Sequence, residues 1–302
     1  MSVASSSISN TGTVYGSDTV AVAGSTTNTG QIVATNSVNL GATGNSGVIQ
    51  AQTVSLGATS NGGSISGNTV TASSMSNSGS VGATNDINVS GDVNNTGAVA
   101  ASNINFSGGT LVNSGQVHAS GNITINASSI NNTAEVVAPI PGVPENTNIP
   151  YASSGAIKAD GVLAISGGSL NNTGTLSSGG VFNIAMGGGI SNNKRGFILS
   201  GGDITLTAAG VTNDGIVYGL NSPPSTIPLA STGGFANGST GVLLAGNQLT
   251  ITATSFSNAG DNVNSGVGSL GNANLSTTGV WDAGSNPLKA NGLLTVNTNG
   301  II

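Results

Sequence analysis

The sequence predicts an all-β protein folded as a right-handed parallel β-helix, a type of β-solenoid, and three observations lead to this fold class. The phrase Asn-x-Gly-x-(Val/Ile/Leu) recurs at a nearly constant step. A short alternating apolar run follows each phrase, and a single apolar residue stands two positions before most of the asparagines. A repeat of this length is typical of a solenoid, in which each repeat forms one coil and stacks on the last. Three short inward-facing runs per coil indicate a roughly triangular section.

The recurring phrase fixes the register of the predicted coils. In the first part of the chain its asparagines are separated by 18, 17, 16, 16, 18 and 18 residues, by subtraction of their numbers. Equivalent residues of successive coils lie about 4.8 Å apart in such a fold, so we expect the asparagines to form an amide ladder. We expect the glycine of the phrase to supply a positive φ angle at the corner. The predicted ladder comprises Asn10, Asn28, Asn45, Asn61, Asn77, Asn95 and Asn113.

The alternating runs and the single apolar positions complete each coil. Examples of the runs are Val38-Asn39-Leu40 and Leu249-Thr250-Ile251, and examples of the single positions are Met75 and Leu111. Alternation with a period of two places both apolar residues of a run on one face of a strand. A series of antiparallel hairpins turning at Asn-x-Gly is the alternative. Hairpins need runs of similar length on both sides of each turn, which the asymmetric repeat does not provide.

We expect a single β-solenoid over residues 1–302, with about 13 coils of 16–21 residues. Residues 1–136 form regular short coils, whereas residues 137–302 form longer coils. At the junction, residues 132–136 (Asn-Thr-Ala-Glu-Val) keep the phrase with alanine in place of glycine. Near the end, residues 258–260 (Asn-Ala-Gly) carry the last clear phrase.

Three insertions interrupt the second half, near residues 139–154, 220–234 and 261–290. Several prolines stand in them, and proline removes a donor from a strand ladder, so we expect no regular strands there. All three follow an Asn-x-Gly phrase and precede the next alternating run, so we expect them to emerge on one side of the solenoid. Insertions of this kind often build the binding face of a solenoid.

The composition excludes several classes of function. The chain has four basic and ten acidic residues and a formal net charge of −6, so it lacks the lysines and arginines that nucleic-acid binding needs. No run of 18 apolar residues is present, which argues against insertion into a membrane. The first five residues have neither a basic nor an apolar region of a signal peptide. We therefore expect a piece of a longer chain or another export signal.

The sequence predicts no catalytic, metal-binding or cofactor-binding residue, and no enzyme. The acidic residues are thinly spread; Asp86 and Asp203 directly precede an alternating run and Asp92 directly follows one, which makes them corner residues. The single histidine, His118, points outward by alternation and has no cysteine beside it that could complete a metal site.

Contact with a carbohydrate would need exposed aromatic side chains, and only Tyr15, Tyr151, Tyr218 and Trp281 are plausible; two of them are the preferred candidates for contact with a carbohydrate or a protein. Tyr151 and Trp281 lie within or beside the insertions, where side chains are expected at the surface. We predict that replacing both by alanine weakens any such binding.

The three-run coil built on this phrase resembles the haemagglutinin repeats of filamentous haemagglutinin-type exoproteins, best over residues 8–136 and 162–217. These are bacterial adhesins exported by two-partner secretion, and they include the stalks of contact-dependent inhibition toxins. The resemblance implies a non-enzymatic stalk segment that is secreted or held at the bacterial cell surface. Its partners would be the rest of a longer adhesin, and a protein or glycan of a host or neighbouring cell.

The alternative function is a subunit of an extracellular filament. The pattern begins at once, with Val3 and Ile8 already in phase, and residues 299–302 stop part-way into a coil. Neither end has an obvious capping segment, and an uncapped coil exposes unpaired backbone groups. On this hypothesis the partners are other copies of the chain, joined end to end.

Overall fold

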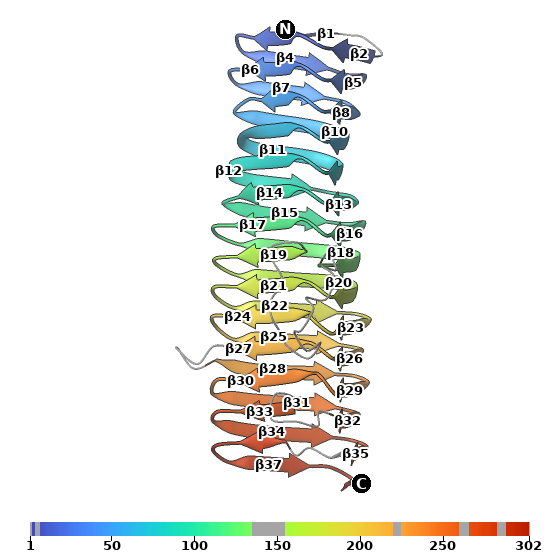
Figure 1. Cartoon of the computed structure of the whole chain (residues 1–302), viewed down its shortest axis with the longest axis vertical. Coiled ribbons are helices and arrows are strands. Elements are labelled where there is room, and N and C mark those ends of the chain that lie inside the picture. The colour runs from blue at the N-terminus through green and yellow to red at the C-terminus, as the bar shows by residue number, and fades with distance from the viewer. Residues whose placement is uncertain are drawn as a thin grey trace, which may run out of the picture. The chain divides into compact units, whose positions relative to one another are not determined.

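The computed structural model describes residues 2–3, 7–134, 155–219, 225–259, 266–282 and 288–301. Every regular element in this part of the chain is a β-strand. The chain divides into two compact units, Met1–Ser128 and Ser129–Ile302. Within each unit, parallel strands of successive coils lie side by side, so each unit is a parallel β-solenoid (Figure 1). The predicted all-β solenoid is therefore confirmed, whereas the right-handed sense of its coil and the single domain over 1–302 stay predictions.

Each coil contributes one strand to each of three parallel sheets. The first sheet contains the strand after the Asn-x-Gly phrase, the second contains the alternating run, and the third ends at the next ladder asparagine. Five strands bend through a corner and serve more than one sheet: β10 Thr53–Asn61, β11 Ser64–Asn77, β12 Ser80–Val89, β18 Ile123–Asn132 and β20 Leu163–Asn172.

The other strands of the first unit are short. In the first sheet they are β3 Thr13–Gly16, β6 Gln31–Ala34, β9 Val48–Gln50, β14 Ala98–Ala101 and β17 Gln116–Ala119. In the second sheet they are β1 Ser2–Val3, β4 Thr19–Val22, β7 Ser37–Leu40 and β15 Asn103–Ser107. In the third sheet they are β2 Ser7–Asn10, β5 Ser25–Asn28, β8 Thr43–Asn45, β13 Val93–Asn95 and β16 Thr110–Asn113.

The second unit repeats the arrangement. Its first sheet contains β19 Ala156–Ala159, β21 Thr175–Ser178, β24 Phe197–Ser200, β27 Ile216–Gly219, β30 Val242–Ala245, β33 Gly266–Ser269 and β36 Lys289–Ala290. Its second sheet contains β20 Leu163–Asn172, which continues into the third, with β22 Phe182–Met186, β25 Ile204–Ala208, β28 Thr226–Ser231, β31 Gln248–Ala253, β34 Asn272–Thr277 and β37 Leu294–Asn297. Its third sheet contains β23 Gly189–Asn192, β26 Gly210–Asn213, β29 Gly234–Asn237, β32 Ser255–Asn258, β35 Val280–Asp282 and β38 Gly300–Ile301.

The core of each unit consists of ladders of identical or similar side chains. In the first sheet Ile49 pairs with Ile32 and Ile65, and all three are at most 1% exposed. In the second sheet Val38 stacks in the same way on Val54. Since the strand spacing brings like residues into contact at every step, each coil buries much of its apolar face against the coils next to it. This explains why the alternating runs are the strongest signal in the sequence.

The position of the first insertion differs from the prediction. Residues 132–136 were expected to keep the phrase intact, but the strand that follows is β19, whose Ala156 pairs with Thr175. Gly155 takes the place of the phrase glycine, since its carbonyl oxygen accepts the Thr175 N–H at 2.9 Å. The extra residues therefore stand inside the phrase, between its asparagine and its glycine. The expected insertion 139–154 itself lies outside the described residues.

The other two predicted insertions are largely regular coil. Thr226–Ser231 is strand β28, and Pro228 within it pairs in register with Thr250 of β31. The prediction that this segment cannot be an ordinary rung was wrong, because the proline occupies a single position of a ladder that continues on both sides of it. Strands β33, β34, β35 and β36 likewise lie inside the predicted insertion 261–290.

The sequence led us to expect that all three insertions stand at one corner of the coil. The described strands that flank them lie instead at two different corners. The described strands on either side of residues 135–154, 260–265 and 283–287 belong to the third and first sheets. Residues 220–224 stand instead between β27 and β28, which belong to the first and second sheets.

Candidate interaction surface

The asparagine ladder is the most regular feature of both units. In the first unit each Nδ2 atom donates to the Oδ1 atom of the next ladder asparagine at 2.7–2.8 Å, from Asn10 through to Asn113. In the second unit the equivalent bonds are 2.8–3.0 Å long and join Asn132, Asn172, Asn192, Asn213, Asn237 and Asn258. The ladder predicted from Asn10 to Asn113 is thus present, and the second unit has one of its own.

Each ladder amide also satisfies the backbone at its corner. Asn95, which is fully buried, donates to the Gly97 carbonyl at 3.2 Å and to the Gln116 carbonyl of the next coil at 3.1 Å. The backbone carbonyl oxygen of Asn95 accepts hydrogen bonds from two backbone N–H groups of the next coil. A buried polar group is tolerated only when it is hydrogen-bonded, and this corner uses nearly every donor and acceptor of the asparagine. The ladder residues are therefore structural.

The phrase glycine is required for a reason that the sequence analysis did not give. Among the described glycines only Gly108, Gly109, Gly155, Gly167 and Gly266 have a positive φ angle, so most phrase glycines do not adopt the left-handed conformation. A Cβ atom on Gly97 would instead lie well inside van der Waals contact with the Gly79 carbonyl oxygen of the preceding coil. Close approach of successive coils excludes a side chain there.

Of the two aromatic residues predicted for binding, Trp281 is in the core. It is 8% exposed and pairs with Phe256 across strands β32 and β35. The two rings meet edge to face at 6.1 Å, and Phe256 stacks on Phe235 at 5.5 Å. The prediction of an exposed contact residue was wrong because Trp281 occupies the inward position two residues before a ladder position. Tyr151 lies outside the described residues.

An apolar surface that the sequence analysis missed lies on the outward side of the first sheet in the second unit. Three successive strands, β24, β27 and β30, present apolar side chains at both outward positions, and the residues between them, Ile198, Val217 and Leu243, point inward and are at most 3% exposed. We call this set the apolar patch; it comprises Phe197, Leu199, Ile216, Tyr218, Val242 and Leu244.

The apolar patch differs from the same positions of the first unit. There β11, β12 and β14 present Ser64 and Ser66, Ser80 and Gly82, and Ala98 and Ala100. Within the patch Phe197 is buried and the other five residues are half-buried. The available signal was three consecutive apolar residues, as in Phe197-Ile198-Leu199, where the alternation of apolar and small residues breaks down.

A shallow groove runs along the outward side of the third sheet in the second unit, with a volume of about 530 Å³. Glycine occupies the same outward position in three successive coils, as Gly189, Gly210 and Gly234, and Ser191 and Thr212 line the next row. The missing side chains produce the hollow. None of the residues that line it is charged.

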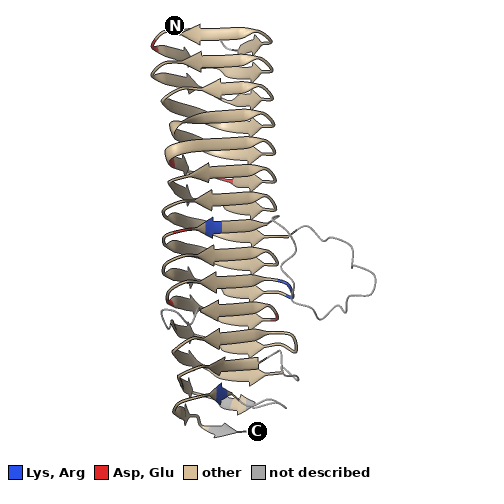
Figure 2. Ribbon diagram, turned by 60° about the vertical axis from the view of Figure 1, so that its left-hand side comes forward, with Lys and Arg blue, Asp and Glu red and all other residues tan. Residues whose placement is uncertain are grey.

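Charged side chains are sparse on the described ribbon (Figure 2). Asp92 is at a corner, as predicted: its Oδ1 atom accepts the Thr110 backbone N–H at 2.7 Å and the Thr110 hydroxyl at 3.1 Å. These two bonds, the backbone one foremost, lower the pKa of the Asp92 carboxyl. His118 is exposed, also as predicted. Among the described residues no three His, Cys, Asp or Glu side chains are grouped so that they could hold a metal ion.

Searches of family models, curated proteins and solved structures return no significant match. The part of the chain that the structure describes also has no helix suited to crossing a membrane. The structural relationship that stands is therefore the general one, a repeat protein with the parallel β-solenoid fold.

Proposed function

We propose that the chain is a structural and adhesive β-solenoid of the bacterial cell surface, a stalk segment that mediates attachment to cells or surfaces. The observation that carries the proposal is the stacked register itself. Among the described residues, thirteen buried asparagines and the apolar ladders join one coil to the next. Each added coil lengthens such a unit by about 4.8 Å along its axis, which suits a spacer that holds binding groups away from a cell.

The resemblance to haemagglutinin-type repeats supports the same proposal. The phrase, the alternating run and the third apolar position that carry this resemblance are the elements that form the three sheets of the coil. The outward positions of the first unit are mostly small and polar, as suits a water-exposed spacer. The apolar patch is a place at which attachment can occur.

Antibodies raised against the purified chain test the proposed location. We expect them to label intact, unpermeabilised cells of the source bacterium, and a protease added outside those cells to remove the signal. Labelling that requires permeabilisation would contradict an extracellular role. A cytoplasmic marker protein serves as the control for cell integrity.

Beads coated with the purified chain test attachment. We expect these beads to be retained on cell monolayers or abiotic surfaces under flow more strongly than beads coated with albumin. Equal retention of the two kinds of bead would remove the adhesive part of the proposal and leave the spacer role.

A further inference from the structure

We propose that the apolar patch is a docking surface for one extended peptide segment of a partner protein, with apolar side chains in its middle and carboxylates at both ends. The inference does not rest on the adhesive role proposed above. It rests on three features of the described residues: the apolar patch, the charges on the same face and the dimensions of that face.

The middle of this face requires an apolar partner. Tyr218 lies in register between Leu199 and Leu244, and Ile216 lies in register between Phe197 and Val242. A contiguous outward apolar array of this kind marks an interaction site more often than a single exposed apolar side chain does.

The ends of the same face require negative charge. The outward row that contains Tyr218 begins with Lys158 in β19 and ends with Lys289 in β36, through Ser177 and Gly268. These are two of the four basic residues of the chain, and the outward strand positions between them hold no carboxylate. Opposite charge at both ends of a segment would fix its register on this face.

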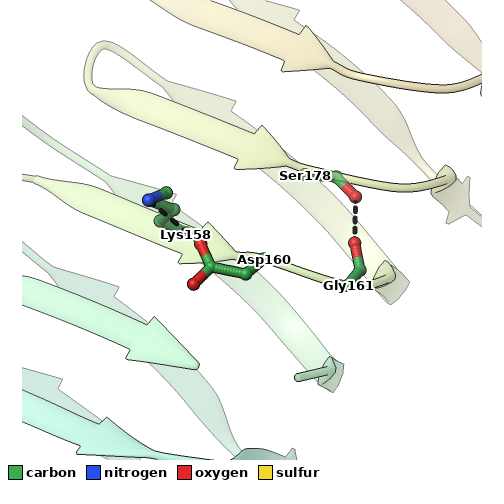
Figure 3. A network of polar contacts seen from close by, with 4 residues as sticks. All are labelled: Lys158, Asp160, Gly161 and Ser178. Carbon is green, nitrogen blue, oxygen red and sulfur yellow. Dashed lines mark hydrogen bonds and ion pairs between the residues drawn. The ribbon is translucent and has the colours of Figure 1, made fainter. Parts of the chain in front are cut away.

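The charged groups at the neighbouring corners are mixed in sign. Lys158 contacts Asp160 at 3.0 Å, and both side chains remain exposed, at 57% and 44% (Figure 3). Asp203 and Asp214 stand at further corners, and Lys194 and Arg195 directly precede Gly196 and Phe197. The positive charge of the face therefore comes from Lys289 and from Lys158, and Asp160 offsets part of the charge of Lys158.

The dimensions fit a single extended chain. The two outward positions of a strand are about 7 Å apart, which is the width of one peptide. Six strand-to-strand steps separate Lys158 from Lys289, a distance of about 29 Å at about 4.8 Å for each step. An extended segment of about nine residues spans this distance.

A second copy of the chain fits less well. A two-fold axis through Tyr218 would place Lys158 of one copy opposite Lys289 of the other, so like charges would meet at both ends. The apolar part is also only three coils high, about 14 Å, whereas a stable dimer buries about 800 Å² on each partner.

A peptide array tests the proposal with the full-length chain as the probe. The array carries peptides of about nine residues that have Val, Ile, Leu and Pro in the middle and either Glu or Lys at both ends. We expect saturable binding of peptides with Glu ends, measured afterwards by fluorescence anisotropy, and much weaker binding of those with Lys ends. No saturable binding of any Glu-ended peptide would overturn the proposal.

Variants of the chain place the binding on this face. Tyr218→Ser should weaken binding of the best peptide by about tenfold or more, and Lys289→Glu should shift preference toward Lys-ended peptides. Val33→Ser is the matched control, because Val33 is a half-buried outward residue of the first sheet in the first unit. Circular dichroism verifies that each variant is folded. Equal binding by wild type and Tyr218→Ser would overturn the assignment.

Three other results would assign the surface to a different occupant and so overturn the proposal. The first is a concentration-dependent dimer that Tyr218→Ser abolishes in sedimentation. The second is Tyr218-dependent binding to phosphatidylserine vesicles without peptide binding. The third is peptide binding that appears only after residues 139–154 are replaced by a Gly-Ser linker. Because the assay uses purified chain, its failure leaves the proposed attachment role standing, and the bead experiment can fail without affecting it.

Discussion

The side chain of a ladder asparagine does more for stability than its exposed neighbour, and Asn95 and Asn94 allow a direct comparison. The Oδ1 atom of Asn95 accepts one hydrogen bond at 2.8 Å, and its two N–H groups are shared among three acceptors at 2.8–3.2 Å, while Asn94 is exposed. Asn95→Ala leaves buried donors and acceptors unpaired, each at a cost of about 1–3 kcal/mol. We expect a loss of several kcal/mol in urea unfolding, and a change within about 0.5 kcal/mol for Asn94→Ala. Similar values for both variants would contradict a stabilising ladder.

Glycine at the phrase corner is expected to be irreplaceable for steric reasons. Gly97→Ala would place a methyl group against the Gly79 carbonyl, whereas a Cβ atom on Gly82 meets nothing within 4 Å. We therefore expect Gly97→Ala to lower the unfolding midpoint strongly. Gly82→Ala should be neutral or stabilise by up to about 1 kcal/mol through the unfolded state. Thermal unfolding of the two variants measures the difference, and a neutral Gly97→Ala would exclude the steric explanation.

Asp92 gives the first unit a dependence on acid. Because hydrogen bonds from Thr110 lower its pKa in the folded protein, its contribution to stability is complete above the ordinary aspartate pKa. The contribution is lost as the pH falls through the lowered folded value. We expect Asp92→Asn to flatten the stability profile below about pH 4 relative to wild type. Asp86→Asn is the control, and unfolding midpoints measured from neutral to acidic pH make the comparison. A parallel decline of wild type and Asp92→Asn would exclude this role.

At the scale of the element, the aromatic stack in the third sheet of the second unit is a packing feature. Phe235, Phe256 and Trp281 follow one another in successive strands, and their rings lie 5.5 and 6.1 Å apart. We expect Trp281→Ala to cost about 3–5 kcal/mol, as truncation of a buried aromatic side chain usually does. Tyr15→Ala, at a residue that is 63% exposed, should cost little. Chemical denaturation of both variants tests this, and a stable Trp281→Ala would mean that the stack contributes little.

The elements themselves were well predicted where residues repeat, and poorly where the chain departs from the repeat. Alternating runs and asparagines identified strands such as β7 and β31, because inward positions recur with period two. The corner at Gly155 was missed because a phrase interrupted between Asn132 and its glycine has no local signature. Pro228 was misread because its effect depends on its neighbours in the ladder. The strand register determines both the corner at Gly155 and the strand position of Pro228, and the sequence does not give this register directly.

At the scale of the whole molecule, few charges take part in folding. Ladders of apolar residues and amides stabilise both units, and the ion pair of Lys158 with Asp160 is solvent-exposed. Exposed ion pairs contribute about 0–1 kcal/mol and are screened by salt. We expect the unfolding temperature to change by less than about 3 °C between about 0.1 and 1 M sodium chloride. A shift several times larger would show that charge pairs matter more than the ladders.

The sequence showed apolar triplets such as Phe197-Ile198-Leu199, but it did not show that they form one surface. The six residues of the apolar patch come from strands 19 to 26 positions apart (Phe197 to Ile216, then Ile216 to Val242). Only the register of the first sheet brings them together. Trp281, by contrast, was assigned to the surface from its place beside an expected insertion, and its position in the third sheet reverses that assignment. Composition could exclude functions here, but it could not locate a site.

The asparagine ladder separates the register of the coils from their length. Asn45 and Asn61 are 16 residues apart, whereas Asn132 and Asn172 are 40 residues apart. The hydrogen bonds between their side-chain amides are nonetheless almost equal in length, at 2.8 and 2.9 Å. A gene encoding such a chain can thus acquire new codons just after a ladder asparagine without losing a single rung. Evolution, or an engineer who grafts a foreign epitope, can therefore vary the segment at that corner while the stacking of the coils stays the same.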